Sequence, residues 1–338
     1  MDLQQRQTAM ARLDATPRLA FGCYPTPIEE MPRLRAALGA GCPRLFIKRD
    51  DYTGFGFGGN KVRALEYLLA EAVAQGAQVV ITMGGERSNH ARMTAACCAR
   101  LGLRCVLVLD RKPRPAGAEA FQPAANFIEK LFGAEVHLVE TREERMSLMP
   151  ALAAQLRAQG VSVFEIPLGG GVLPGPLGFV AAARELAEQI QEAGLQFSHL
   201  FFASSSGGTQ AGLLLGAQLC DFAATQIIGV SPDDPAEVIT EETRRLLREM
   251  SALSGAAADE LPITVLDEYA GPGYCIGTAE SEEAVQFLAR TEGIILDPVY
   301  TAKAMAALLD WIRQGKLTAH DTVLFWHTGG QLTMFYAP

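Results

Sequence analysis

The residue of this sequence best suited to covalent chemistry is a lysine at the start of a predicted helix. Four glycines within residues 54–59 precede Lys61. Apolar residues then recur at a helical spacing, at Val62, Leu65, Leu68, Leu69 and Ala72. The positive end of a helix dipole favours a neutral amine, which is the form that attacks a carbonyl and forms a Schiff base. Lys61 is therefore the first catalytic candidate, and the alternative is a solvated surface lysine.

A second group of polar residues follows a predicted strand, residues 78–82, at the end where α/β folds place their active sites. Ser88 and Asn89 would present a hydroxyl, an amide and backbone N–H groups at the N-terminus of the next helix. Such a set of donors suits a carboxylate. The alternative is an ordinary N-cap serine followed by turn residues.

A third group lies between a predicted strand and a predicted helix, in the Ser-Ser-Ser-Gly-Gly-Thr sequence of residues 204–209. Small residues let backbone amides approach an anion, hydroxyls add donors, and the helix dipole favours negative charge. This pattern predicts a phosphate cradle at Ser206, Gly207, Gly208 and Thr209. It is not a Walker A loop, because no Gly-Lys-Ser/Thr follows. The alternative is an ordinary β–α turn with an N-cap.

Three further residues are candidates from their positions in turns. Thr328 follows the last predicted strand and could reach a cofactor ring nitrogen, whereas His327 beside it is interpreted as structural. Tyr274 and Tyr300 lie in glycine- and proline-containing turns, where a tyrosine can serve as a general acid or hydrogen-bond donor. Anchoring aromatics are an equally good interpretation of the two tyrosines taken alone.

The glycines of residues 54–59 also match G-x-G-x-x-G, the dinucleotide fingerprint. The context is poor, because the preceding predicted strand ends several residues before the first glycine. No acidic residue ends the next predicted strand, residues 79–82, to hold a ribose. A nicotinamide-dependent oxidoreductase is therefore a distant alternative.

The composition bounds the class of protein. Of the 338 residues, 49% are hydrophobic and 20% charged, which allows a large core. The net charge of −9 and the lack of a basic run argue against nucleic-acid and anionic-membrane partners. The seven cysteines are scattered without disulfide or metal-ligand spacing, so we expect reduced thiols, a cytoplasmic location and no metal site.

Short apolar runs alternate with alanine- and leucine-rich segments, which predicts an α/β fold with parallel, doubly covered sheets. The predicted strands are residues 44–48, 78–82, 104–109, 135–139, 161–166, 199–203, 226–230, 262–267 and 322–326. Turn-rich breaks at residues 50–60 and 167–178 suggest a small inserted domain, residues 52–167. Residues 1–51 and 168–338 would then form a larger domain.

Six motifs occur in the order found in a known family. They are Lys48-Arg49-Asp50-Asp51, Gly58-Gly59-Asn60-Lys61, Ser88-Asn89-His90, Ser206-Gly207-Gly208-Thr209, Leu296-Asp297-Pro298-Val299-Tyr300 and His327-Thr328-Gly329-Gly330. Together they resemble the pyridoxal-phosphate enzymes that include D-cysteine desulfhydrase and 1-aminocyclopropane-1-carboxylate deaminase. The resemblance runs from about residue 20 to the C-terminus.

The resemblance implies a fold-type II (tryptophan-synthase-β-like) architecture, usually homodimeric, with two doubly wound domains and the cofactor between them. It implies that Lys61 binds pyridoxal 5'-phosphate as a Schiff base, that Asn60 lies near the ring and that residues 206–209 hold the phosphate. Ser88 and Asn89 would bind the substrate carboxylate with His90 beside them. The predicted catalytic residues are Lys61, Ser88, Tyr274 and Tyr300.

Two positions discriminate within the family. Its deaminases carry a glutamate after the second tyrosine and a leucine in the last motif, where this chain has Thr301 and Thr328 as in the desulfhydrases. A neutral hydroxyl does not hold the pyridine ring charged as a carboxylate would, so the ring is a weaker electron sink. This suits Cα-proton loss and β-elimination better than ring opening.

Two stretches depart from the family pattern. Arg87 replaces the usual glutamine before Ser88, and residues 275–278 replace the usual Gly-Val-Pro after Tyr274. Arg87 could pair with a second acidic group of the substrate, such as the sulfonate of cysteate. The alternative is a surface pairing of Arg87 with Glu86.

The leading hypothesis is a pyridoxal-phosphate-dependent lyase that converts a small amino acid to pyruvate and ammonia by α,β-elimination, most similar to D-cysteine desulfhydrase. The alternatives are L-cysteate sulfo-lyase and 1-aminocyclopropane-1-carboxylate deaminase. A protein that keeps this fold without turnover is the alternative outside catalysis.

Overall fold

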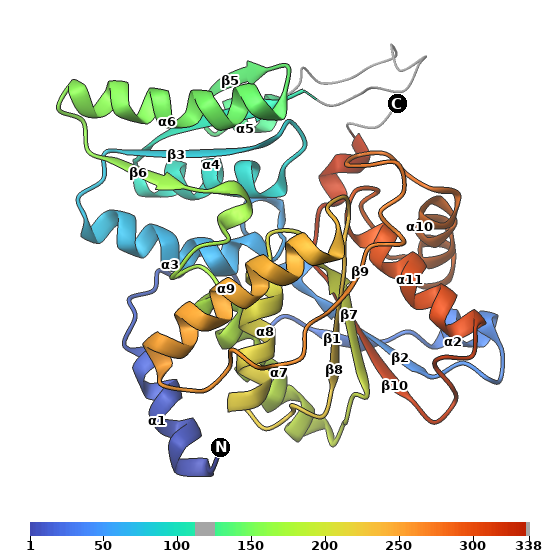
Figure 1. Cartoon of the computed structure of the whole chain (residues 1–338). Coiled ribbons are helices and arrows are strands. Elements are labelled where there is room, and N and C mark those ends of the chain that lie inside the picture. The colour runs from blue at the N-terminus through green and yellow to red at the C-terminus, as the bar shows by residue number, and fades with distance from the viewer. Residues whose placement is uncertain (112–125, 336–338) are drawn as a thin grey trace.

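The computed structural model describes residues 1–111 and 126–335. Within them, the strands form a six-stranded sheet in the order β1-β2-β10-β7-β8-β9 and a four-stranded sheet in the order β5-β4-β3-β6 (Figure 1). The strands are β1 (Ile28–Glu30), β2 (Arg44–Arg49), β3 (Val79–Gly85), β4 (Arg104–Asp110), β5 (Glu135–Val139), β6 (Val163–Ile166), β7 (His199–Ala203), β8 (Gln226–Val230), β9 (Thr264–Leu266) and β10 (Thr322–His327). The helices are α1 (Leu3–Asp14), α2 (Pro32–Leu38), α3 (Lys61–Ala74), α4 (Asn89–Leu101), α5 (Phe127–Leu131), α6 (Arg142–Ala158), α7 (Leu177–Ala193), α8 (Gly208–Leu219), α9 (Ala236–Ser254), α10 (Ala279–Glu292) and α11 (Thr301–Arg313).

The smaller sheet is covered on both faces. Its four strands are parallel to their neighbours. Ile81 and Val108 pack with residues of α6, whereas the alternating residues Val80 and Leu107 pack in the cluster that includes α4. Figure 1 shows α6 and α4 on opposite faces of this sheet. Burial on both faces explains why these strands have near-continuous apolar sequences.

The larger sheet is organised around β10, the last strand of the chain, which lies between β2 and β7 and is parallel to both. Leu324 and Trp326 of β10 pack in the cluster that includes α7 and α8. Val323 and Phe325, on the other face, pack in the cluster that includes α10 and α11. The carboxyl ends of β2, β7 and β10 therefore lie side by side.

The predicted fold class is confirmed, and each of the nine predicted strands is present with ends shifted by up to three residues. β1 is not among the predicted strands and is antiparallel to β2, so the prediction of wholly parallel sheets is wrong at this edge. β1 has only three residues, too few to show an alternating pattern. Three helices were also not predicted: α2 and α5 have only seven and five residues, and α1, with 12 residues, is mostly polar.

The strands of the smaller sheet all lie between residues 79 and 166, and those of the larger sheet lie outside that range. The domain boundaries at residues 52 and 167 stay a prediction. Among the described residues, none of the helices combines the length and the apolar character needed to cross a bilayer.

Candidate active site

The glycine loop before Lys61 is held by backbone contacts that exclude side chains. The N–H of Gly59 donates to the carbonyl of Asp50 at 2.9 Å and to Oγ1 of Thr53 at 2.9 Å. Gly58 has a φ of +74°, and a Cβ on it would lie 1.9 Å from the Asp51 carbonyl. Only glycine fits at residue 58. The loop needs this glycine in order to place Lys61 at the start of α3.

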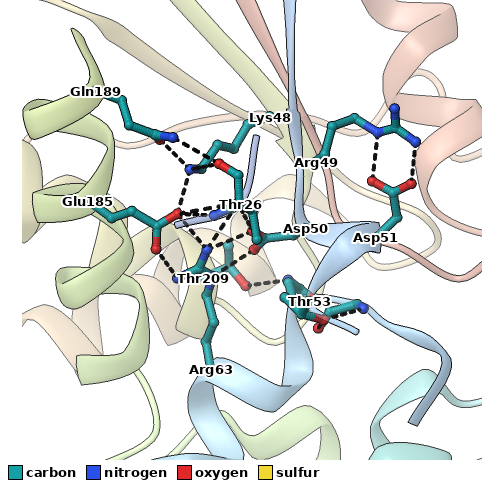
Figure 2. Close-up of polar contacts among 12 residues, drawn as sticks. Thr26, Lys48, Arg49, Asp50, Asp51, Thr53, Arg63, Glu185, Gln189 and Thr209 are labelled. Carbon is teal, nitrogen blue, oxygen red and sulfur yellow. Dashed lines mark hydrogen bonds and ion pairs between the residues drawn. The ribbon is translucent and has the colours of Figure 1, made fainter. Parts of the chain in front are cut away.

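A buried network of charges fixes the first turn of α3 to the rest of the molecule (Figure 2). Arg63, 1% exposed, donates to both carboxylate oxygens of Asp50 at 2.8 Å and to Glu185 of α7 at 2.9 Å. Lys48 of β2 pairs with the same Glu185. Burial alone would raise the pKa of Glu185, but Arg63 and Lys48 outweigh burial and lower it to about 2. Glu185 therefore stays charged at neutral pH, and the network joins β2, α3 and α7.

Lys61 itself has few partners. Its Nζ donates to the carbonyl of Gly169 at 3.3 Å. Burial lowers the pKa of Lys61 to about 8. The expected cause of a neutral amine is the helix dipole, whereas in the structure the cause is desolvation. Either cause raises the neutral fraction that attacks a carbonyl.

Ser88 and Asn89 lie at the N-terminus of α4, as predicted. Ser88 is the N-cap, and its Oγ accepts a hydrogen bond from the N–H of Ala91 at 3.2 Å. The Oδ1 of Asn89 accepts from Arg92 at 3.3 Å. The hydroxyl hydrogen of Ser88 and the amide N–H₂ of Asn89 keep donors available for an anion.

His90 has a defined tautomer. The hydroxyl of Thr82 donates its one hydrogen to the carbonyl of Ile166 at 2.8 Å. The contact of 3.0 Å between Thr82 Oγ1 and His90 Nε2 therefore requires that Nε2 carry the hydrogen and donate. Burial, with the nearby charge of Lys61, lowers the pKa of His90 to about 3. His90 is thus a neutral imidazole whose Nδ1 can only accept.

The predicted phosphate cradle joins β7 to α8. Gly207 is the N-cap of α8 with a φ of +73°, and a Cβ on it would lie 2.9 Å from the backbone nitrogen of Thr243. Thr209 accepts a hydrogen bond from the Nδ2 of Asn60 at 3.2 Å. The residue before Lys61 and the cradle are therefore directly connected.

The two predicted tyrosines contact each other. The hydroxyls of Tyr274 and Tyr300 share a hydrogen bond, and their rings lie 5.8 Å apart at 70°. Burial is the main cause that raises the pKa of both phenols well above the usual value. His327, beside Thr328, has both ring nitrogens bonded to backbone groups, as expected of a structural histidine.

One cavity collects most of the predicted site residues. Its lining includes Asn60, Lys61, Ser88, Asn89, His90, Ser206, Gly207, Thr209, Tyr274, Tyr300 and Thr328. Gly208 and Arg87 are not in the lining. Glu86 and Arg87 are 7% and 8% exposed, so the alternative of a surface pairing between them is wrong.

The cavity also contains four charged residues that the sequence analysis missed. Arg142 and Arg145 come from the start of α6, and Asp233 and Asp234 follow β8. Arg142 and Asp234 form an ion pair at 3.4 Å between the two sheets, and Arg145 pairs with Asp110. The aspartates could have been found, because they follow a predicted strand at its carboxyl end. The arginines carry no such sequence pattern.

Comparison with known proteins agrees with this geometry. The family model of pyridoxal-phosphate dependent enzymes matches residues 19–329. The D-cysteine desulfhydrases of Serratia proteamaculans (strain 568) and Klebsiella pneumoniae (strain 342) are 38% and 39% identical, over 99% and 97% of this chain and 98% of each relative. The crystal structure of an ACC deaminase homologue matches with a TM-score of 0.84 at 36% identity, covering 96% of this chain and 94% of that chain.

The chain belongs to the family of pyridoxal-phosphate dependent enzymes. A fungal L-serine ammonia-lyase from Rhizomucor miehei, 16% identical with a TM-score of 0.66 over 92% of this chain and 96% of that chain, shares the fold. Pyridoxal 5'-phosphate is therefore the cofactor of this chain.

The cavity fits that cofactor. Gly169 lies between Lys61 and the cradle, and a Cβ on it would lie 2.8 Å from Ser206 Oγ and 3.9 Å from Lys61 Nζ. The glycine keeps open the space that the cofactor needs between its lysine and its phosphate loop. The N-terminus of α8 favours a phosphate dianion. Among the described residues, no three His, Cys, Asp or Glu side chains gather as a metal site would need.

Proposed function

We propose that this chain is a lyase that releases sulfide, pyruvate and ammonia from D-cysteine. The two desulfhydrases similar to it over nearly their whole lengths support this assignment. The observation that carries it is the hydrogen-bonded pair Tyr274 and Tyr300, which lines the same cavity as Lys61. In this proposal the two phenol hydroxyls flank the substrate side chain that departs.

Each residue of the cavity has a role in this proposal. Pyridoxal phosphate, when bound, supplies an electron sink that acidifies the Cα proton of an amino acid. The amine of Lys61 takes that proton, and its lowered pKa provides the neutral base. Ser88 and Asn89 hold the substrate carboxylate with their free donors. Ser206, Gly207 and Thr209 hold the phosphate with backbone and hydroxyl donors.

Thr328, which lines the cavity, would supply the hydroxyl partner of the cofactor ring. Thr301 is fully buried, and its hydroxyl donates to Asp297 at 2.7 Å. Asp297 also accepts from the backbone N–H groups of Val299, Tyr300 and Thr301. Thr301 therefore acts with Asp297 in holding the start of α11, and the ring nitrogen has no carboxylate partner from this position.

A second candidate substrate is an amino acid with an additional anionic group, such as L-cysteate. Arg142 and Arg145, which line the cavity, favour this substrate. They take the role of pairing with the second anion that was predicted for Arg87. Both guanidinium groups already have carboxylate partners, so the net positive charge available to a sulfonate is small. For this reason D-cysteine remains the first choice. 1-Aminocyclopropane-1-carboxylate is the third, because the structural neighbour at 36% identity is an ACC deaminase homologue.

The nicotinamide alternative has no structural support. Two short 3₁₀ helices, Asp50–Tyr52 and Phe55–Phe57, separate β2 from α3, whereas a dinucleotide fingerprint needs a glycine turn directly between strand and helix. A homodimer and a cytoplasmic location stay predictions.

The test combines labelling and turnover. Borohydride treatment of the yellow holoenzyme should bleach it, and peptide mapping should find the pyridoxyl group on Lys61. Pyruvate release should then be measured side by side with D-cysteine, L-cysteate and 1-aminocyclopropane-1-carboxylate. Fastest release from D-cysteine supports the proposal, and release from another substrate alone contradicts the substrate assignment.

A further inference from the structure

A second buried lysine lies behind the tyrosine pair. Lys303 is the third residue of α11 and is 1% exposed. Its Nζ donates to three backbone carbonyls, those of Pro232 at 2.7 Å, Ala270 at 2.6 Å and Gly273 at 3.0 Å. The mechanism proposed above gives this residue no role.

The three contacts require an ammonium. A protonated lysine has three N–H donors, and each finds one carbonyl here, whereas a neutral amine has only two. Burial lowers the pKa of Lys303, and the charges of Asp233, Cys275 and Asp297 act in the opposite direction. The matched set of acceptors is what holds a cation in a place that water does not reach.

The carbonyls belong to loops of the candidate active site. Pro232 precedes Asp233, and Gly273 precedes Tyr274, and both of these neighbours line the cavity. Lys303 itself follows Tyr300 by one helical turn. One nitrogen therefore ties three segments, and it fixes the position of Tyr274 relative to Tyr300.

Converging backbone carbonyls are also the ligands that proteins use for potassium, because they replace its hydration shell. We propose that Lys303 is a tethered monovalent cation that occupies a carbonyl site built for an ion of this size and positions Tyr274 against Tyr300. Lys303 is thus a positioning residue, and the enzyme needs no free potassium. The catalytic part of this inference rests on the proposed function of the tyrosine pair.

The test removes the ammonium of Lys303 by substitution and supplies a free cation in solution. Lys303→Ala opens the carbonyl site, whereas Lys303→Met removes the charge and keeps the space filled. Pyruvate release should be compared in potassium, methylammonium and tetramethylammonium chloride at equal ionic strength. Unfolding temperatures of the cofactor-free proteins in the same salts provide a readout that needs no substrate.

We expect Lys303→Ala to lose about a hundredfold in kcat, because a misplacement of about 1 Å costs that much. Potassium or methylammonium should raise the kcat of Lys303→Ala about tenfold, and should also raise its unfolding temperature. Lys303→Met and tetramethylammonium should give no recovery. The wild-type enzyme should work equally well in every salt.

Full activity of Lys303→Ala, or a loss that no cation reverses in activity and unfolding temperature, would overturn the inference. Wild-type activity that depends on potassium would overturn it too, and this measurement decides even if Lys303→Ala does not fold. If the wild type turns over none of the three substrates, the proposed function fails, while the unfolding temperatures still test the cation site.

Discussion

Two lysines of this enzyme, Lys303 and the partly buried Lys61, differ in how fully they are hydrogen-bonded. Lys303 meets three carbonyls within 3.0 Å, one for each N–H of its ammonium. Within residues 1–111 and 126–335, Lys61 has a single carbonyl contact, at 3.3 Å. A buried ammonium with all its donors satisfied is held in place, whereas one with unsatisfied donors loses its proton more easily. The number of acceptors around each Nζ therefore distinguishes the structural lysine from the reactive one.

The largest expected effect comes from removing the reactive lysine. Lys61→Ala should lower kcat by at least about a thousandfold, because the proton acceptor is lost. The unfolding temperature of the cofactor-free protein should change little, since Lys61 makes one weak hydrogen bond with the described residues. Pyruvate release measures the change in kcat, and thermal unfolding measures the change in unfolding temperature. Turnover close to that of the wild type would remove Lys61 from the mechanism.

Disruption of the buried charge network should instead lower the free energy of unfolding. Arg63→Met leaves the carboxylates of Asp50 and Glu185 buried without their main partner, which typically costs about 3–5 kcal/mol. Arg104→Ala is the matched control, because it breaks an ion pair with Glu135 in which both side chains are more than 40% exposed. Such a pair contributes about 1 kcal/mol at most. Urea unfolding of the cofactor-free proteins measures the free energy of unfolding that each variant loses. Equal losses would contradict the expectation that the buried pairs contribute more than the exposed one.

The lowered pKa of Lys61, caused by desolvation, predicts a pH dependence. Only the neutral amine of Lys61 attacks a carbonyl, and its pKa of about 8 lies below the ordinary 10.5. The rate at which the cofactor-free protein binds pyridoxal phosphate covalently should therefore rise with pH and level off above about pH 8. His90, with a pKa of about 3, should add no second step between pH 5 and 7. A rate that still rises steeply at pH 10 would show an ordinary lysine.

The smallest expected effect concerns the exposed cation of the cavity. Arg142→Ala should weaken inhibition of the D-cysteine reaction by L-cysteate about tenfold, the size of one charge-assisted hydrogen bond. The KM for D-cysteine should stay within about twofold, because this substrate has no second anion. Arg87→Ala is the control, since Arg87 does not line the cavity. Equal effects of both variants would mean that the guanidinium of Arg142 does not meet the ligand.

How much the sequence predicted depends on whether a feature is local. Lys61, Ser88 and the loop of residues 204–209 were predicted because each follows a strand or a glycine turn at the carboxyl edge of a sheet. The partners of Lys303 were not predicted, because Pro232, Ala270 and Gly273 are brought together only by tertiary packing. Arg87 was given a site role from its neighbours in sequence, but its side chain does not line the cavity.

The position of β10 has a consequence for synthesis of the chain. All strands of the smaller sheet have been synthesised once Ile166 is added, whereas β2 and β7, which is complete at Ala203, lack their common neighbour until synthesis reaches His327. At roughly 5–20 residues per second, the interval is on the order of ten seconds. During that time the nascent chain carries two open strand edges that can pair with other chains. A truncation before Thr322 would leave those edges open permanently.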